Sequence, residues 1–241
     1  MKHKIITFGE LMLRLSPDNN ERFTQAHSYE AVYGGGEANT AVSLANFNVD
    51  TRYVTKLPKH TIGQSAVNSL RQYGVDVSRI VRGGDQIGIY FLEKKTSQRP
   101  TNVIYNRNGS AFALATKEDF DWDSIFDGAT WFHFSGITPA ISDNMAEITI
   151  EACKEAKKRG ITVSCDLNYR SKLWSSEKAN KVMSEVCRYV DICIANEDDA
   201  VGIFGMDASK SDKEKNAYIA EELTKMFPNF KISFDLSLIH I

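Results

Sequence analysis

The sequence predicts an α/β fold: a doubly wound, mostly parallel sheet with flanking helices, accompanied by a small β-sheet. Short apolar runs alternate with helical patterns along most of the chain, which is typical of βαβ units and of a parallel sheet covered on both faces. Two other stretches alternate polar and apolar residues as half-buried hairpins do, and they predict the small sheet.

The composition is that of an ordinary globular protein. Of 241 residues, 42% are hydrophobic and 25% charged, and 29 Lys and Arg against 31 Asp and Glu give a formal net charge of −2. This balance excludes disordered and disulfide-scaffold classes, and nothing in it points to nucleic acid or a membrane as a partner.

The sequence shows neither a signal-peptide core nor an apolar run of about 18 residues. The four cysteines form no C-x-x-C pair, so we expect a cytoplasmic protein with reduced, mostly buried thiols.

The main elements follow in order along the chain. Strands are predicted at 5–8, 51–56, 130–135, 162–166 and 191–195. Helices are predicted at 37–47, 62–73, 144–159 and 217–227. A charged surface connection at 207–216 precedes the last helix.

The small sheet is expected to combine 12–15 with 28–33, and 87–94 with 102–105. These segments come from different parts of the chain. A sheet of this kind beside the carboxyl ends of the main strands would act as a lid that excludes water from a closed site.

A glycine cluster, Gly34-Gly35-Gly36, opens the first predicted helix. Glycine allows a ligand to approach the backbone closely, but a helix entry that needs flexible backbone explains the cluster about equally well. As a G-x-G-x-x-G pattern it carries Asn39 at the third position and does not follow the first strand. A dinucleotide site, and with it a nicotinamide dehydrogenase, is therefore disfavoured.

Polar residues stand at the end of one predicted strand and directly after it: Asp166, Asn168 and Arg170. Ligands of open α/β sheets bind at the carboxyl ends of strands, and the planar guanidinium of Arg170 suits a carboxylate or a phosphate. A surface loop with local turns and salt bridges is the alternative.

A second polar group, Asn196, Glu197 and Asp199, directly follows the next strand. Clustered carboxylates there suit Mg²⁺ held with waters near phosphates. Helix capping by Asn196 with acidic residues in the first turn explains the same pattern, and both interpretations can hold together.

Tyr90, Tyr105 and Arg107 are expected on the lid strands. Their hydroxyls and guanidinium could hold a small hydroxylated acid, whereas ordinary cross-strand packing is the alternative.

Taken in order, these segments resemble the ribokinase-like (PfkB-type) carbohydrate kinases. The resemblance covers nearly all of residues 3–233 and rests on F-G-E-L, G-G-G-E-A-N-x-A, L-x-x-x-G-V-D, S-G-I-T-P, D-L-N-Y-R and A-N-E-D-D. Each motif is short, but their ordered set is specific. Within the family the chain is most similar to 2-keto-3-deoxygluconate kinases, on the segments G-E-L-M-L-R-L-S-P, N-R-N-G-S-A, S-G-I-T-P and D-L-N-Y-R-x-x-L-W. Fructokinase-like members usually carry Asp where this chain has Arg14.

The resemblance implies a sugar-acid site. Gly35 would lie against the sugar acid, with Asn39 and Glu10 on the floor of the pocket. Tyr90, Tyr105 and Arg107 would contact the ligand from the lid.

The resemblance also implies roles for the residues after the two strands. Arg170, with Asn168 beside it, would meet the acid or stabilise the charge of the transferred phosphate. Asn196 begins the family's N-x-x-E segment, which helps hold Mg²⁺ and phosphate through water. Asp199 replaces the Glu of that segment, and Glu197 and Asp166 are grouped with it.

The family's catalytic Gly-Ala-Gly-Asp stretch, whose Asp is the general base, does not occur in the sequence. Residues 236–241 look like one reading frame of a sequencing adapter. We therefore expect residues 1–235 to form an incomplete ribokinase-like domain with lid strands drawn from about 12–33 and 87–107. The C-terminal part would be missing, residues 236–241 would be a non-native tail, and this fragment would be inactive.

The predicted function is an ATP-dependent kinase that converts 2-keto-3-deoxygluconate to its 6-phosphate, with ATP and Mg²⁺ as cofactors of the full-length enzyme. This chain would hold its substrate-binding portion. Another ribokinase-like sugar kinase, of the fructokinase type for example, and a non-catalytic sugar-acid-binding protein are the alternatives. The resemblance further implies a homodimer formed through the lid.

Overall fold

The computed structural model describes residues 3–207 and 215–235. The chain divides into two compact units: the first contains the described residues before Gly9 and after Ala115, and the second is Gly9–Ala115. Within the described ranges, no helix has the length and apolar character needed to cross a membrane. The predicted tail at 236–241, and residues 208–214 of the predicted charged connection, lie outside the described residues.

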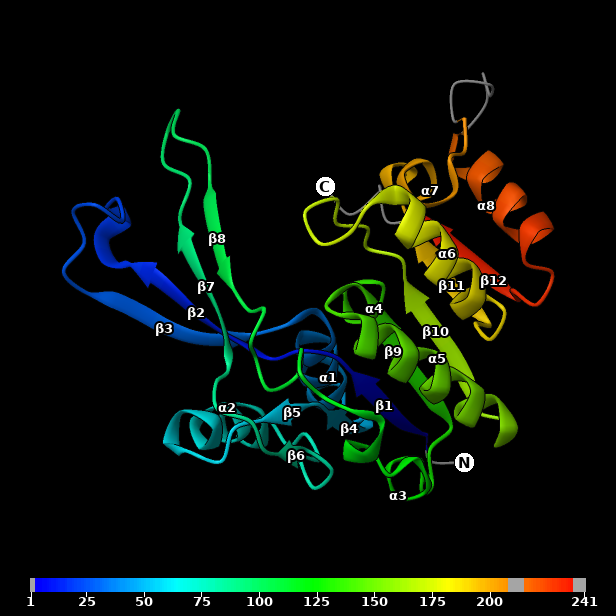
Figure 1. Cartoon of the computed structure of the whole chain (residues 1–241), viewed down its shortest axis with the longest axis horizontal. Helices are drawn as coiled ribbons and strands as arrows, with labels where there is room; N and C mark the ends of the chain where they lie inside the picture. Colours follow the sequence, from blue (N-terminus) through cyan, green and yellow to red (C-terminus); the bar gives the residue numbers. More distant parts are fainter. Residues whose placement is uncertain (1–2, 208–214, 236–241) are drawn as a thin grey trace. The chain divides into compact units, whose positions relative to one another are not determined.

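The first unit is built on a parallel sheet (Figure 1). Its strands run in the order β12 (Ile232–Asp235), β11 (Ile192–Ala195), β10 (Thr162–Asp166), β9 (Trp131–Ser135) and β1 (Lys4–Phe8), and every neighbouring pair is parallel. This confirms the α/β prediction. The four strands that the sequence predicts in this unit begin and end within one residue of those observed.

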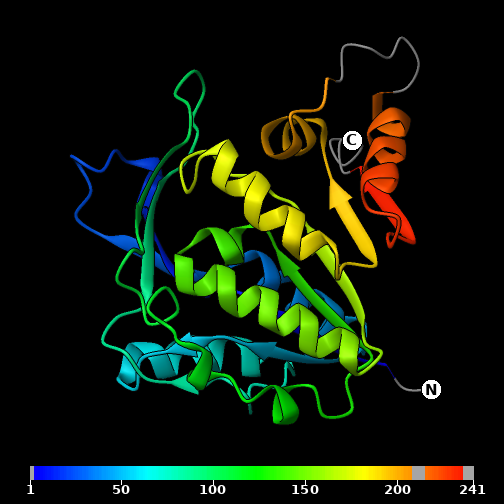
Figure 2. The same ribbon diagram turned by 45° about the vertical axis from the view of Figure 1, so that its right-hand side comes forward.

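Helices connect these strands. They are α3 (Trp122–Ile125), α4 (Ile137–Ala140), α5 (Asp143–Lys158), α6 (Ser176–Cys187), α7 (Glu197–Phe204) and α8 (Lys215–Met226), with a 3-10 turn η2 at Lys117–Asp119. The α5 and α6 helices lie side by side along the sheet (Figures 1 and 2). Ser142 caps α5 by accepting a hydrogen bond from the Met145 N–H, and Gly160, with φ of 68°, follows the helix end.

Aromatic side chains fill the core of the first unit where β1 meets β9. The rings of Phe8 and Trp122 pack edge to face with centroids 5.6 Å apart, and those of Phe126 and Phe132 with centroids 5.2 Å apart. All four are buried. Edge-to-face pairs stabilise a core beyond their buried area, so they help fix β1 against a strand that lies far along the chain.

The second unit contains the predicted small sheet, in the order β3 (Tyr29–Gly34), β2 (Met12–Pro17), β7 (Gly88–Glu93) and β8 (Asn102–Asn106) (Figure 1). The outer pairs are antiparallel, as expected of hairpins, and β2 runs parallel to β7 in the centre. The segments predicted from two parts of the chain therefore form one sheet. Arg107, expected on a lid strand, instead lies one residue beyond the end of β8.

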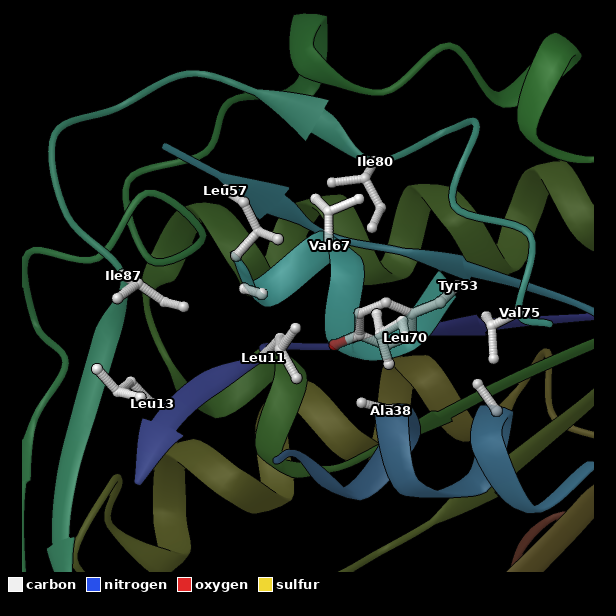
Figure 3. Packing of buried hydrophobic residues seen from close by; sticks show 12 residues of the cluster. Leu11, Leu13, Ala38, Tyr53, Leu57, Val67, Leu70, Val75, Ile80 and Ile87 are labelled. Carbon is white, nitrogen blue, oxygen red and sulfur yellow. The ribbon is translucent and has the colours of Figure 1, made fainter. Parts of the chain in front are cut away.

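The rest of the second unit packs on this sheet through an apolar core. Its other elements are the 3-10 turn η1 (Asp18–Asn20), α1 (Gly36–Asn46), β4 (Asp50–Val54), β5 (Lys56–Leu57), α2 (Thr61–Arg71) and β6 (Val81–Arg82). Figure 3 shows Leu11, Tyr53 and Leu70 meeting in the middle of this core. The buried Tyr53 hydroxyl donates to the Gly9 carbonyl at 2.8 Å. The core thus ties β4 to the chain that enters β2.

Candidate functional site

The second unit contains a pocket of about 330 Å³ where the four-stranded sheet meets the start of α1. It is lined by Met12, Arg14, Val32, Tyr33, Gly34, Gly35, Gly36, Asn39, Tyr90 and Tyr105. Four residues that the sequence analysis assigns to a ligand are therefore brought together: Gly35, Asn39, Tyr90 and Tyr105. Such a volume is in the range of small-molecule sites.

One cross-strand row supplies much of the pocket. Val32 pairs with Arg14, Arg14 with Tyr90, and Tyr90 with Tyr105, so the row crosses all four strands. The rings of Tyr90 and Tyr105 lie with centroids 5.9 Å apart. The alternation of β2 explains the placement, because Leu13 and Leu15 turn to the apolar core while Arg14 lines the pocket.

The glycine cluster forms the helix side of the pocket. Gly35 is the N-cap residue of α1. Because glycine has no side chain, it accepts no hydrogen bond through a side chain from the first N–H groups of the helix. A Cβ atom at Gly35 would lie 2.2 Å from the Glu10 carbonyl oxygen, whereas one at Gly36 would meet nothing within 4 Å. The close approach of the Glu10 carbonyl to the backbone therefore requires glycine at position 35, whereas position 36 has room for a side chain.

Glu10 and Arg107, also predicted to contact the ligand, form a buried ion pair and do not line the pocket. The Arg107 Nε donates to Glu10 Oε2 at 2.8 Å, and the Ser110 hydroxyl donates to Glu10 Oε1. Burial raises the pKa of Glu10 because its desolvation outweighs the stabilising effects of Arg107 and Ser110. The Arg107 guanidinium also lies over the Tyr105 ring, 5.9 Å from its centroid, so the pair supports the pocket from outside its lining.

The other predicted residues lie in the first unit, at the end of β10 or after it, and after β11. Asn168 has φ of 39°, a left-handed conformation that asparagine tolerates better than most residues. The next residue is held to α7, since the Tyr169 N–H donates to Asp199 Oδ1 at 2.6 Å. Arg170 is exposed: its carbonyl accepts from the Leu173 N–H at 2.9 Å, while its guanidinium makes no hydrogen bond or ion pair with the described residues.

Asn196 and Asp199 form a capping box at the start of α7. Asn196 Oδ1 accepts from the Asp199 N–H at 2.8 Å, and Asp199 Oδ2 accepts from the Asn196 N–H at 3.0 Å. Burial raises the pKa of Asp199, against the effect of the N–H groups of Asn196 and Tyr169 and of the Arg170 charge. The capping interpretation of this segment is thus confirmed.

These hydrogen bonds fit direct metal coordination poorly. Both carboxylate oxygens of Asp199 already accept N–H groups, and the described parts of the chain bring together no group of three His, Cys, Asp or Glu side chains suited to a metal ion. That Asn196, Glu197, Asp199 and Asp166 help hold Mg²⁺ through water stays a prediction.

Comparison with known proteins places the chain in a family. The sequence model described as pfkB family carbohydrate kinase matches residues 2–229. The chain belongs to this family.

The relatives of this chain include kinases whose names state a sugar acid as the substrate. It is 37% identical over 209 residues to a 2-dehydro-3-deoxygalactonokinase of Haloferax volcanii, a match that covers 86% of this chain and 65% of the relative. It is 29% identical over 179 residues to a 2-dehydro-3-deoxygluconokinase of Bacillus subtilis, covering 73% and 55% of the two chains. The chain thus spans less than two thirds of the length of these relatives.

A solved structure of a 2-dehydro-3-deoxygluconokinase from Thermotoga maritima has the same fold. The TM-score is 0.92 at 49% identity, and the match covers 96% of this chain and 70% of the other. The ribokinase-like fold predicted from the ordered motifs is confirmed.

Met12, Arg14, Val32 and Tyr33 also line the pocket, although no ligand role was predicted for them from the sequence. Arg14 could have been found from its strand. It is the charged residue in an M-L-R-L-S-P segment whose leucines face the core, so alternation places it on the opposite face.

Proposed function

We propose that this chain is the sugar-acid-binding part of an ATP-dependent kinase that phosphorylates the C6 hydroxyl of 2-keto-3-deoxygluconate. The observation that carries the proposal is the pocket of the second unit. It combines tyrosine hydroxyls, an asparagine amide, backbone N–H groups of a helix start and one guanidinium. These groups suit a small polyhydroxylated anion.

Each group has a role that follows from its chemistry. Tyr90, Tyr105 and Asn39 orient the sugar hydroxyls, and Gly35 permits the ligand to lie against the backbone. Arg170 meets the acid or the transferred phosphate as a charge stabiliser. Phosphoryl transfer depends mainly on positioning and charge stabilisation. The pocket residues would supply the positioning, and Arg170 would stabilise charge.

ATP supplies the γ-phosphoryl group in this proposal, and Mg²⁺ neutralises its charge when bound. The family resemblance places the general base in a Gly-Ala-Gly-Asp stretch that is not part of this sequence. We therefore expect this chain to bind the sugar acid without phosphorylating it. A homodimer through the four-stranded sheet and a cytoplasmic location also belong to the proposal.

The names of the relatives support the substrate class. 2-Dehydro-3-deoxygluconate and 2-dehydro-3-deoxygalactonate differ only in configuration at C4, and both carry a carboxylate next to a keto group. The positive charge of Arg14 in the pocket favours such an acid over a neutral hexose, which counts against a fructokinase-type enzyme.

Calorimetric titration of the chain with each C4 epimer tests the binding step. We expect saturable binding of at least one epimer, weaker binding of fructose, and no ADP production in a coupled assay with ATP. A longer product that contains this chain together with the Gly-Ala-Gly-Asp stretch should phosphorylate the acid that binds. Binding without turnover by that longer product would favour a non-catalytic sugar-acid-binding protein, and absence of sugar-acid binding would contradict the proposal.

A further inference from the structure

Glu10 lies in the second unit where the elements of the pocket converge. It stands two residues before Met12, the first residue of β2, and is only 4% exposed. Met12 pairs with Gly34 of β3 on one side and with Gly88 of β7 on the other. The four-stranded sheet therefore begins directly after Glu10.

The backbone and the side chain of Glu10 contact different sides of the pocket. The backbone carbonyl packs against Gly35 at the start of α1, since a Cβ atom there would lie 2.2 Å from the carbonyl oxygen. The carboxylate packs against Gly88 at the start of β7, where a Cβ atom would lie 2.6 Å from Glu10 Oε1. The helix start and β7 are thus both in close contact with one residue.

The carboxylate also holds the chain where it leaves β8. Arg107 Nε donates to Glu10 Oε2 at 2.8 Å, and the Ser110 hydroxyl donates to Glu10 Oε1. The Ser110 N–H closes the turn by donating to the Arg107 carbonyl at 3.0 Å. The Ala111 N–H then donates to the Gln86 carbonyl, just before β7, at 2.8 Å. The buried carboxylate therefore fixes the exit of β8 relative to the entry of β7.

A displacement of these strands would reach the groups that bind the ligand. Tyr90 of β7 and Tyr105 of β8 are paired across the two strands, and both line the pocket. Hydroxyl groups bind a ligand well when they are held in place beforehand, because ordering them on binding costs free energy. A residue that fixes both strands therefore determines how well the pocket is formed before the ligand arrives.

We propose that Glu10 is the positioning residue of the pocket: it binds no ligand group itself, and it holds β7, the end of β8 and the start of α1 in the arrangement that receives the sugar acid. The inference rests on the proposed function and adds a residue that acts through others. The ionised carboxylate is the active form, because the ion pair with Arg107 requires a negative charge.

Calorimetric titration with 2-keto-3-deoxygluconate at pH 7 tests this role through Gly88, which does not line the pocket. Gly88→Ala places a methyl group where the Glu10 carboxylate lies and leaves every charge and every lining side chain in place. It should weaken binding roughly 10-fold. Gly83→Ala is the matched control: its Cβ would meet only Lys56 Cε, at 3.4 Å, so the affinity should not change.

The pH profile of binding separates positioning from a merely structural role. Burial raises the pKa of Glu10 above its ordinary value, against the effects of Arg107 and Ser110. The affinity of the unmodified chain should therefore fall as the pH is lowered from 7 through this raised pKa, because protonation removes the ion pair. Glu10→Gln should bind roughly 10-fold more weakly at pH 7 and should not show this decline.

Other titratable groups near Glu10 are the same in both proteins. Glu37 of α1 and Tyr53 of β4 interact with Glu10 electrostatically. Burial raises the pKa of Tyr53 well above its ordinary value, so its hydroxyl stays protonated over the whole range. A difference between the two pH profiles therefore reports on Glu10.

Thermal melts of all variants show whether the fold is retained, and if one of the two test variants fails to fold, the other decides. Unchanged affinity in Gly88→Ala would overturn the positioning role, and so would a decline at low pH that persists in Glu10→Gln. The proposed function would stand in both cases. If the unmodified chain does not bind the sugar acid at all, the proposed function fails, and the inference fails with it.

Discussion

Gly35 shows how a single residue determines the shape of the pocket. Its φ of −176° is ordinary extended backbone, so conformational freedom does not explain the glycine. The space does, because the Glu10 carbonyl would meet an added Cβ at 2.2 Å. Steric contact with the Glu10 carbonyl therefore requires the middle residue of the cluster to be glycine.

Gly35→Ala should lower the free energy of unfolding by about 1–3 kcal/mol, because backbone has to move to admit the methyl group. It should also weaken sugar-acid binding. Gly36→Ala is the matched control: with open space at its Cβ and a place in the first turn of α1, it should stabilise by about 0.5–1 kcal/mol. Urea denaturation measures both effects, and equal stability of the two variants would contradict the steric argument.

The Glu10–Arg107 pair illustrates what local pattern could not predict. Both residues were predicted from the sequence as site residues, but the partners are 97 positions apart and their mutual burial follows from the fold. Gly35, Tyr90 and Tyr105 were predictable as pocket residues from a helix start and from strand alternation, whereas Asn39 was predicted through the family resemblance. Burial and pairing of charges depend on tertiary contacts that no local window contains.

Arg107→Met should destabilise the protein by about 3–5 kcal/mol, because it leaves the Glu10 carboxylate buried without its cation. Adding Glu10→Gln should recover part of this loss, since the uncompensated charge is then removed. A double-mutant cycle from urea denaturation measures the coupling. Additive effects of the two changes would show that the ion pair is not energetically coupled.

At the scale of elements, periodicity predicted most boundaries closely, and the exceptions have physical reasons. The predicted strand at 51–56 is divided into β4 and β5, which belong to different sheets. Arg107 lies outside β8 because a turn begins there: its carbonyl accepts a hydrogen bond from the Ser110 N–H. Strand pairing also brings β1 beside β9, far along the chain, and local pattern carries no information on that order.

Asp191 joins three elements of the first unit and makes their docking sensitive to pH. Its carboxylate accepts from Lys157 Nζ of α5 at 2.7 Å and from the Val163 N–H of β10 at 2.9 Å, while its carbonyl accepts from the Lys231 N–H before β12. Burial alone would raise the pKa of Asp191, but these hydrogen bonds and cations lower it below its ordinary value. The folded state therefore favours the ionised form.

A lowered pKa fixes the sign of the pH effect. The stability that Asp191 contributes is present above its unfolded pKa of about 3.9 and is lost as the pH falls through the lower folded value. Asp191→Asn should cost about 2–4 kcal/mol at pH 7 and flatten the decline in stability below about pH 4.

Chemical denaturation at several pH values measures this effect. Asp123→Asn, which alters an exposed partner of Arg159 in the same unit, should change the stability by less than about 0.5 kcal/mol. An Asp191→Asn variant with the same acid dependence as the unmodified protein would contradict the assignment.

At the scale of the whole molecule, the predicted site residues are divided between the two units. The pocket and its glycine, asparagine and tyrosines belong to Gly9–Ala115, whereas Arg170 and the α7 cap belong to the first unit. All four cysteines of the chain also belong to the first unit. Cysteine reactivity therefore reports on one unit of the molecule.

The thiols should be inert in the folded protein and reactive once the first unit opens. Cys153, Cys165, Cys187 and Cys193 are free and fully buried, and burial raises the pKa of each thiol well above its ordinary value. Only the thiolate attacks a disulfide reagent, so neither access nor ionisation favours reaction in the native state.

We expect no labelling by a disulfide reagent at pH 8 in the absence of denaturant, and four thiols labelled per chain in guanidinium. At intermediate denaturant the extent of labelling should follow the loss of far-UV circular dichroism, because Cys153 and Cys187 are buried residues of the helices α5 and α6. Rapid labelling of any thiol before that loss would show that the core of the first unit opens locally.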